Sequence, residues 1–418
     1  MLSIAMLGYG TVGSGVVELI NNNKTKFVKG MNENLEVSKI LVRDMDKYKG
    51  SKYRAKITDN FDEVMRGKVD IVVEVMGGVY PSYDYVKRAL ESKKHVVTAN
   101  KDLIAEHGAK LLDIANLNGV GLRFEASVGG GIPILKSISD CLIGNNISSI
   151  KAILNGTTNF ILTKMNDEDM EYDEALKIAQ ELGFAEADPD SDVLGLDAAR
   201  KLSILSTMAF QKKVNWKNIN AIGINNIDGN DFRYAKREGY NIKLLAISKI
   251  VDDNVYAQVS PVMVRKNSSL GGIQNEYNAI LVEGDAVGDI MFSGKGAGMM
   301  PTASAMFADI ADIVQNKKEN PVIFDYEAAN VGSLWENESK WLLRVRTDNR
   351  IEVMKKLTLN FSNCDIIAGE FGEHGDEVAA FVRSDNEGKL NKCIDEMKKN
   401  EELREVKKIM MLEDRDMP

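Results

Sequence analysis

Four carboxylates are crowded into the ten residues 183–192, and a helical pattern follows them directly. These four are Glu186, Asp188, Asp190 and Asp192. In the helical pattern, Asp197 and Lys201 stand four residues apart, so they share one helix face. Acids on such a loop could bind a cationic amine, and a lysine held beside them could polarise or protonate a carbonyl oxygen as hydride arrives. A solvated loop whose acids only favour the helix start is the alternative, and the residues alone leave both open.

A glycine-rich turn near the N-terminus has the spacing of a dinucleotide-binding loop. A short apolar run precedes it and apolar residues at helical spacing follow it, which is the context that gives this motif its meaning. Gly8 permits the tight turn, Gly10 lets the backbone approach a pyrophosphate, and Gly13 allows close packing of helix on strand. The start of the helix offers free N–H groups to the phosphates. The cofactor-binding residues expected here are Gly8, Gly10, Thr11, Val12 and Gly13.

Three further strand patterns end in residues that suit the same ligand. The strand over 37–42 is followed by Arg43 and Asp44, an arginine that suits a 2′-phosphate and a carboxylate that suits a free ribose hydroxyl. We expect NADP with Arg43 as its phosphate contact, and Asp44 keeps NAD open. Gly77 follows the strand over 70–75, where a glycine either lets the chain pass close to a ligand or simply turns it. Lys101 follows the strand over 95–98 and would reach the nicotinamide or the substrate.

Residues 125–133 join one carboxylate, Glu125, to three glycines and a proline. Such a segment curves tightly and can turn several carbonyl groups toward one point. A carboxylate with convergent carbonyls is typical of a hard-cation site that takes sodium, potassium or calcium. A plain tight connection explains the same residues, so the pattern alone does not decide between the two.

Strand and helix patterns alternate over the first 135 residues or so, which predicts a doubly wound parallel sheet of the Rossmann type. Strands are expected near residues 4–7, 35–42, 70–75, 95–98 and 121–125, and the polar stretch 21–34 is expected to be a loop. From about residue 138 the pattern becomes mixed α/β and ends in a long helix over 300–314. Residues 315–337 are polar and predict a linker. The last 80 residues follow a β-α-β-β-α-β order, which predicts a ferredoxin-like module.

We therefore expect three domains in the chain. Residues 1–137 would bind the dinucleotide, with 295–318 packing back on them, and 138–294 would form a substrate and dimerisation domain. Residues 338–418 would form the C-terminal module. A length of 418 residues is too great for a single core and agrees with such a division.

The composition is that of an ordinary soluble protein. The net charge of −9 argues against a nucleic-acid or anionic-membrane partner. Three widely spaced cysteines favour reduced thiols, and three histidines make a histidine-based metal centre unlikely. No apolar run approaches the length of a membrane span, and the N-terminus lacks a basic region followed by an apolar stretch. We expect a cytoplasmic protein with a small-molecule substrate.

Several of these strings, in this order, resemble the homoserine dehydrogenases. The similarity spans residues 1 to about 315. The strings that carry it are the Gly8–Gly13 turn, Thr98–Lys101, Glu125–Pro133, Asn155–Phe160, the acid loop 183–192 with Asp197 and Lys201, and Pro301–Ala305. The resemblance implies NAD(P)H-dependent, reversible reduction of L-aspartate 4-semialdehyde to L-homoserine, at the branch toward threonine and methionine. It also implies a homodimer or homotetramer.

The resemblance also assigns roles to individual residues. Glu186 would contact the substrate amino group, and Asp192 and Asp197 would orient the substrate. Lys201 would donate the proton to the carbonyl oxygen, with Lys101 also at the reacting centre. The residues implied for a sodium ion are Glu125 and the carbonyls of Val128, Gly130 and Ile132, and the glycine loop near the nicotinamide would include Gly296.

The C-terminal module resembles the ACT domains that follow many bacterial homoserine dehydrogenases and often sense threonine. Such domains commonly carry a glycine in the turn after their first strand, whereas this chain has Thr347–Arg350 there. We therefore expect the fold without strong effector binding. Two other functions stay open: another amino-acid dehydrogenase on this scaffold, which the acid loop disfavours, and an inactive amino-acid sensor. A sensor would not require Lys101, Lys201 and Glu186.

Overall fold

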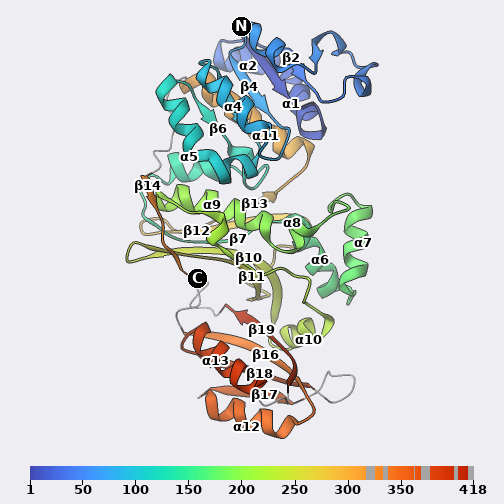
Figure 1. Ribbon diagram of the computed structural model, residues 1–418, viewed down its shortest axis with the longest axis vertical. Coiled ribbons are helices and arrows are strands. Elements are labelled where there is room, and N and C mark those ends of the chain that lie inside the picture. The colour runs from blue at the N-terminus through green and yellow to red at the C-terminus, as the bar shows by residue number, and fades with distance from the viewer. Residues whose placement is uncertain (317–324, 333–337, 362, 369–376, 400–402, 413–418) are drawn as a thin grey trace. The chain divides into compact units, whose positions relative to one another are not determined.

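The computed structural model describes residues 1–316, 325–332, 338–361, 363–368, 377–399 and 403–412. They fold as two compact units, whose helices and strands are labelled in Figure 1. The first unit comprises residues 1–148, 200–218 and 278–330, and the second comprises 149–199, 219–277 and 331–418. Helix α9 (Leu196–Phe210) begins in the second unit and continues into the first.

A six-stranded parallel sheet forms the centre of the first unit and confirms the Rossmann-type prediction. Its strand order is β3 (Ile57–Thr58), β2 (Leu35–Leu41), β1 (Leu2–Leu7), β4 (Ile71–Glu74), β5 (His95–Thr98) and β6 (Leu122–Arg123). The middle strands are apolar on both faces because helices cover both, and Ile71, Val72 and Val73 are all at most 1% exposed. The order reverses between β1 and β4, which is where dinucleotides bind in such sheets.

The helices of this sheet follow the expected alternation. They are α1 (Thr11–Asn22), α2 (Lys24–Met31), α3 (Phe61–Arg66), α4 (Ser82–Glu91) and α5 (Lys101–Asn118). A sixth helix, α11 (Met299–Asn316), comes from far along the chain and packs on α1 (Figure 1). A Cβ at Gly15 would lie 2.8 Å from Met299 Cγ and 3.2 Å from Ala303 Cβ, so glycine is what allows this close helix pair.

Two local expectations for this region are wrong. The polar composition of 21–34 predicts a loop, but α2 occupies most of the stretch. It contains no proline, its single glycine lies in the last turn of the helix, and Asn32 in the left-handed conformation ends the helix. The expected strand over 121–125 is only Leu122–Arg123, because Glu125 begins a 3₁₀ turn.

The remaining elements of the first unit include two pairs of strands. Strand β12 (Tyr277–Gly284) neighbours β13 (Gly288–Lys295), and β8 (Lys212–Lys213) pairs in parallel with β14 (Asp325–Ala328). The expected linker 315–337 therefore contains structure, because it also holds β15 (Val331–Gly332), which pairs with β11 (Asn254–Arg265). Residues 317–324 and 333–337 of that stretch lie outside the described residues.

The second unit is a mixed α/β structure, as expected. Its helices are α6 (Gly156–Asp167), α7 (Tyr172–Glu181), α8 (Asp190–Val193) and α10 (Gly229–Arg237), and its strands include β7 (Ile147–Ile153), β9 (Asn220–Ala221), β10 (Tyr240–Val251) and β11 (Asn254–Arg265). Strands β10 and β11 form a long antiparallel hairpin. Asp252 and Asp253 both have positive φ at its turn, the conformation that matches the twist of a two-residue hairpin.

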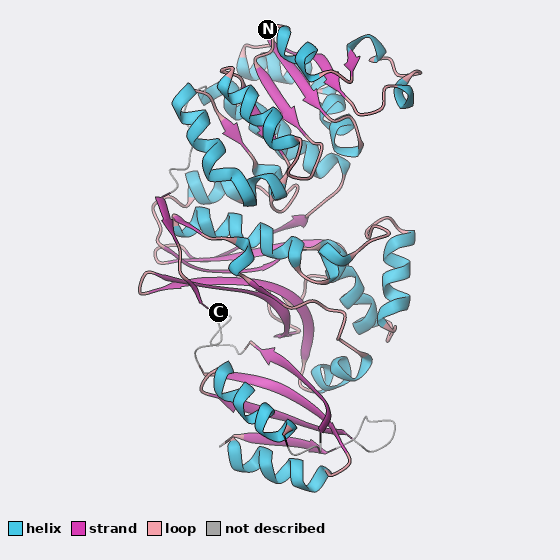
Figure 2. Cartoon of the chain, viewed as in Figure 1, coloured by secondary structure: helices cyan, strands magenta, loops and turns pink. Residues whose placement is uncertain are grey.

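The C-terminal module has the predicted ferredoxin-like order. It consists of β16 (Ser339–Thr347), α12 (Arg350–Asn360), β17 (Cys364–Ala368), β18 (Glu377–Ser384), α13 (Glu387–Lys398) and β19 (Leu403–Met411). Its antiparallel sheet runs β19-β16-β18-β17, with both helices on one face (Figure 2). Strand β19 also pairs with β11, so the module continues the sheet of the second unit. No described helix combines the length and apolar character that a bilayer crossing requires.

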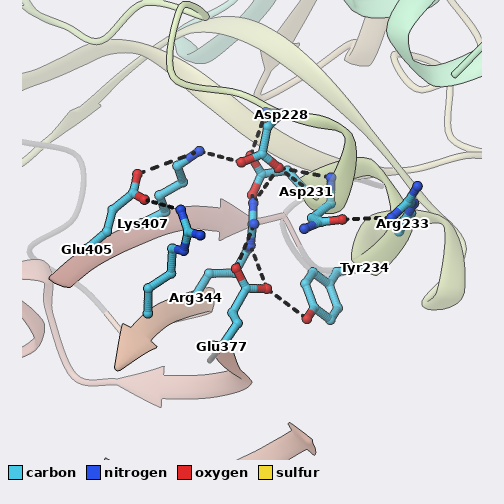
Figure 3. Close-up of polar contacts among 10 residues, drawn as sticks. Asp228, Asp231, Arg233, Tyr234, Arg344, Glu377, Glu405 and Lys407 are labelled. Carbon is cyan, nitrogen blue, oxygen red and sulfur yellow. Dashed lines mark hydrogen bonds and ion pairs between the residues drawn. The ribbon is translucent and has the colours of Figure 1, made fainter. Parts of the chain in front are cut away.

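A buried ion network holds this module to α10 (Figure 3). Arg344 on β16 is only 5% exposed and pairs with Asp228 at 2.7 Å, Asp231 at 2.5 Å and Glu377 at 2.8 Å. The hydroxyl of Tyr234 donates to Glu377 at 3.0 Å. Because a buried charge is costly without its partners, this network makes the contact between α10 and the module specific.

Candidate active site

The turn after β1 has the local geometry of a dinucleotide loop. Gly8 has a φ of +104°, and a Cβ there would lie 2.9 Å from the Val75 carbonyl oxygen. A Cβ at Gly13 would lie 2.6 Å from the Gly8 carbonyl oxygen, so packing within the protein requires both glycines. A Cβ at Gly10 would have no protein atom within 4 Å, so that side of the turn is open. Helix α1 begins at Thr11 and has no acidic residue in its first turn.

Arg43 is exposed just beyond β2, next to Asp44. The Asp44 carboxylate accepts a hydrogen bond from the backbone N–H of Asp46 at 2.9 Å, so it is engaged in its own turn. The neighbouring turn is fixed by Tyr48, whose hydroxyl donates to the Tyr9 carbonyl at 2.9 Å. The guanidinium of Arg43 is thus the group with more freedom to meet a ligand.

The carboxyl ends of β4 and β5 are joined by a buried acid that none of the sequence motifs includes. Glu74, the last residue of β4, accepts a hydrogen bond from the Thr98 hydroxyl at 2.5 Å. Asn100 caps α5 by accepting from the Leu103 N–H at 3.0 Å, and Lys101 is the first residue of that helix. Gly77, beyond β4, has a φ of +74° and is exposed, and a Cβ there would have nothing within 4 Å. The positive φ favours glycine at this position, whereas packing does not require it.

Two glycine loops interlock in the first unit. The backbone N–H of Gly131 donates to the Lys295 carbonyl at 3.1 Å, and a Cβ at Gly130 would lie 2.4 Å from the Gly296 carbonyl oxygen. A Cβ at Gly296 would in turn overlap the side-chain amide of Asn278, at 1.9 Å. Close packing therefore accounts for glycine at 130 and 296, and it places the predicted nicotinamide loop against the predicted cation loop.

The Glu125 carboxylate is buried and accepts hydrogen bonds from the backbone N–H groups of Leu135 at 2.9 Å and Lys136 at 2.7 Å. Its own N–H donates to the buried carboxylate of Asp309 at 3.0 Å. Burial raises the pKa of Glu125 and raises that of Asp309 well above its usual value, with their mutual repulsion as a further cause for Asp309. Lys136 and Arg123 already offset part of this negative charge, and a bound cation beside the two buried acids would offset more of it, so the residues present fit a cation.

Side chains alone would not form that cation site. Among the described residues, no three His, Cys, Asp or Glu side chains come together as a metal site. A site on Glu125 would thus depend on backbone carbonyls, as predicted for Val128, Gly130 and Ile132. The carbonyl of Ile132 already accepts a hydrogen bond from the Ile134 N–H at 2.9 Å, and a second lone pair remains for an ion.

In the second unit, one asparagine gathers two of the predicted substrate acids. The side-chain amide of Asn155 donates to Asp192 at 2.8 Å and to Asp197 at 2.9 Å. Its carbonyl oxygen accepts from the Thr158 N–H at 2.8 Å and so caps α6. Asn155 is 5% exposed and Asp197 is 2% exposed, so both are held firmly. Asn155 belongs to the Asn155–Phe160 string, but no sequence pattern predicts that it joins the two acids.

Glu186 lies on the exposed part of the acid loop. Two hydrogen bonds anchor the loop: the Thr157 hydroxyl donates to the Phe184 carbonyl at 2.6 Å, and the Gln180 amide donates to the Glu186 carbonyl at 3.1 Å. Glu186 is exposed. The structure thus brings Asp192 and Asp197 together, and it leaves Glu186 on a fixed loop without a contact to either.

The two predicted catalytic lysines lie on helices that are tied together in the first unit. Lys201 follows Asp197 by one turn of α9 and is half-buried, as is Lys101 at the start of α5. Arg200 pairs with Asp102 at 3.3 Å, and these residues are the sequence neighbours of the two lysines. An ion pair at this point fixes the starts of the two lysine-bearing segments with respect to each other.

Comparisons with known proteins indicate the family of this chain. Residues 8–125 match the family model described as homoserine dehydrogenase, NAD binding domain, and residues 133–311 match the model described as homoserine dehydrogenase. The homoserine dehydrogenase of Bacillus subtilis (strain 168) is 40% identical over 367 residues, which cover 86% of this chain and 85% of that protein. The Corynebacterium glutamicum protein of the same name is 35% identical over 425 residues, covering 99% and 96%.

Solved structures give the same result. A homoserine dehydrogenase from Thiobacillus denitrificans superposes with a TM-score of 0.91 at 32% identity, covering 99% of this chain and 98% of that one. A hyperthermophilic archaeal homoserine dehydrogenase, solved in complex with NADPH, superposes with a TM-score of 0.64 at 27% identity. That similarity covers 76% of this chain and 99% of the archaeal one.

Proposed function

This chain belongs to the homoserine dehydrogenase family, and from that premise we propose a role for each residue of its active site. The protein is an NAD(P)-dependent oxidoreductase that reduces L-aspartate 4-semialdehyde to L-homoserine, reversibly, in threonine and methionine biosynthesis. The proposal depends on the contacts made at the start of α9. There, Asn155 holds Asp192 and Asp197 together, and Lys201 follows one turn later.

The acids bind and orient the substrate. The semialdehyde carries an α-ammonium group, and the exposed carboxylate of Glu186 supplies its charge partner. Asp192 and Asp197, joined by Asn155, form a fixed anionic surface that orients the substrate against Lys201. Fixed carboxylates lose little freedom when substrate binds, which favours a reactive geometry.

Lys201 donates the proton. When bound, the reduced nicotinamide supplies hydride to the aldehyde carbon, and the carbonyl oxygen becomes negative. The ammonium group of Lys201 stabilises that charge and transfers its proton to the oxygen, and Lys101 adds a second positive charge at the same centre. Both effects are stronger in the transition state than in the ground state, so they accelerate the reaction.

The cofactor is NADP, with NAD as the weaker alternative. Gly8, Gly10 and Gly13 with the N–H groups of Thr11 and Val12 would receive the pyrophosphate, while Gly77 and Gly296 would border the nicotinamide. The archaeal relative was solved with NADPH. In this chain, Asp44 is engaged in its own turn and Arg43 is not, which favours a 2′-phosphate over a free hydroxyl.

A sodium or potassium ion would be held by Glu125 and the carbonyls of Val128, Gly130 and Ile132. Its charge would offset the two buried acids, Glu125 and Asp309. The melting temperature should therefore rise when sodium or potassium chloride replaces tetramethylammonium chloride at equal ionic strength. Equal melting temperatures in the three salts would contradict the binding of sodium or potassium at Glu125.

The remaining assignments concern the organisation of the chain. We propose a cytoplasmic homodimer or homotetramer with domains at 1–137 plus 295–318, at 138–294 and at 338–418. Two polar side chains of the turn after β16 already have partners within the module: Asn349 caps α12, and Asp348 pairs with Arg404 at 2.5 Å. Weak or absent inhibition by threonine is expected from such a turn.

One assay tests the proposed function. Purified protein is incubated with aspartate semialdehyde and either NADPH or NADH, and loss of the reduced nicotinamide is followed by absorbance. We expect turnover with the semialdehyde, faster at low NADPH than at low NADH, and none with a 2-keto acid plus ammonia. Turnover with the keto acid and ammonia but not with the semialdehyde would point to another amino-acid dehydrogenase on this scaffold. No turnover with either substrate would point to a sensor.

A further inference from the structure

Glu74 is a charged residue in the interior of the Rossmann sheet that no role above uses. It ends β4 at the crossover between β1 and β4 and is 0% exposed. One carboxylate oxygen accepts from the Thr98 hydroxyl at 2.5 Å. The other accepts from the Met76 N–H at 2.8 Å and lies 3.5 Å from the Asn100 amide nitrogen.

The groups that Glu74 contacts belong to the two segments that border the predicted nicotinamide site. Asn100 reaches across from β5 and donates to the Gly78 carbonyl at 2.6 Å, so it joins the end of β5 to the glycine turn after β4. Its backbone N–H donates to the Thr98 hydroxyl oxygen at 3.0 Å. The residue that follows it is Lys101. Glu74 therefore accepts hydrogen bonds both from the segment that leads into the glycine turn and from the segment that leads into α5.

This arrangement excludes some roles for Glu74. With no exposed surface it cannot touch substrate, and the four groups that hydrogen-bond its carboxylate, from Thr98, Met76, Asn100 and Ser82, are all donors. Burial raises the pKa of Glu74, and the hydrogen bonds from these four donors oppose that shift. A buried carboxylate is costly unless it is fully hydrogen-bonded, so these donors are held tightly in one arrangement.

We propose that Glu74 is a positioning residue for the reaction: through Thr98 and Asn100 it sets the place of Lys101 and of the Gly77–Gly78 turn. The inference rests on the proposed function, because it assumes that Lys101 acts at the reacting centre. A displacement of about 1 Å at such a centre can cost on the order of a hundredfold in rate. A carboxylate that never meets the substrate can therefore control turnover.

The test compares Glu74→Gln with wild type, and then repeats the change in a Lys101→Ala background. Glutamine keeps the shape but replaces one acceptor oxygen by an NH2 donor, which must then face either the Thr98 hydroxyl or the Met76 N–H. We expect Glu74→Gln to lower kcat by about tenfold or more, with KM for the semialdehyde changing less than about threefold. In the Lys101→Ala background the same change should cost less than about threefold, because its effect passes through the missing lysine.

Two controls separate positioning from a general loss of fold. Glu377→Gln removes a comparably buried and hydrogen-bonded carboxylate in the C-terminal module, and it should leave the ratio of kcat to KM near wild type. If Glu74→Gln fails to fold, Thr98→Val removes a single hydroxyl from the same network and is tested in the same two backgrounds.

The outcomes are distinguishable. An equal proportional loss in both backgrounds, or no loss in either, overturns the positioning role while Lys101→Ala still shows that the lysine acts. Normal turnover of Lys101→Ala contradicts the proposed role of that lysine and this inference with it. No turnover by wild-type protein contradicts the proposed function itself.

Discussion

Arg200 and Asp102 form an ion pair at 3.3 Å, and each is the direct sequence neighbour of one of the two proposed active-site lysines. Asp102 follows Lys101 at the start of α5, and Arg200 precedes Lys201 on α9. The pair is partly shielded, with side-chain exposures of 32% for Asp102 and 20% for Arg200, and Arg200 also lies over the Trp216 ring at 4.4 Å. The helices that carry the two proposed lysines are thus joined directly beside those lysines.

Asp102→Asn should therefore lower kcat by about three- to tenfold, because loss of the ion pair loosens the two lysine-bearing segments. KM for NADPH should change little, since Asp102 is not among the residues proposed to bind the cofactor. Steady-state kinetics measures both. As a matched control, Asp62→Asn removes a surface acid that pairs with Arg88 at 2.7 Å and should leave kcat unchanged. Equal effects of the two variants would contradict the role given to Arg200 and Asp102.

Asn155→Leu should raise KM for aspartate semialdehyde by about tenfold or more. Without the amide, Asp192 and Asp197 lose their shared donor and repel each other, so they no longer present a fixed surface to the substrate. KM for NADPH is the internal control and should stay within about twofold. An unchanged KM for the semialdehyde would place these acids outside the substrate site.

Arg43→Ala should weaken NADPH far more than NADH, because only NADPH carries the 2′-phosphate that the guanidinium would bind. The ratio of kcat/KM for the two cofactors measures this directly. Lys47→Ala, which removes another positive charge between β2 and β3, controls for the loss of general electrostatic attraction. Equal losses with both cofactors would mean that Arg43 contacts the adenine or supports the fold.

Lys243 should make stability rise with pH in the alkaline range. It is 3% exposed on β10, and its ammonium group donates to Asn159 at 3.0 Å and to the Ile273 carbonyl. Burial lowers its pKa from 10.5 to about 8. Between those values the unfolded chain binds more protons than the folded one, so the free energy of unfolding increases with pH by up to about 1.4 kcal/mol per pH unit.

Lys243→Met isolates this contribution, since the substitution removes the titrating group but keeps a long apolar side chain. As the pH rises from 8 to 10.5, the unfolding free energy of the wild type should increase relative to that of the variant. Denaturant titrations at several pH values measure it. Parallel pH profiles of the two proteins would show that Lys243 titrates normally.

The fold could be predicted from the sequence where apolar periodicity is strong. The buried strand Ile71–Glu74 and the β-α-β-β-α-β order of the C-terminal module are examples. Helix α2 was not predicted because it has only eight residues, and its three apolar ones, Phe27, Val28 and Met31, are too few to outweigh the polar residues around them. Effector binding by the module is a different question from its fold, and it stays a prediction.

The candidate site divides in the same way. Lys101, Lys201 and the acid loop have a spacing that can be recognised, because they lie at strand ends or one helix turn apart. Glu74 and Asn155 have no such spacing, since their partners at Thr98 and Asp197 are 24 and 42 residues away. A polar residue at the carboxyl end of a buried strand was the one available signal for Glu74. For Asn155, the signal was a cap residue inside a recognised string.

If Lys201 protonates the carbonyl oxygen during reduction, Lys201→Ala should turn over aspartate semialdehyde far more slowly than the wild type. We predict that kcat for aspartate semialdehyde falls by at least about a hundredfold, the usual scale for a general acid, while the dissociation constant of NADPH stays within about threefold of wild type. Lys213→Ala, which removes a lysine just beyond the same helix, should retain wild-type kcat. Near-normal turnover of Lys201→Ala, together with an inactive Lys101→Ala, would rule out Lys201 as the proton donor and assign that role to Lys101.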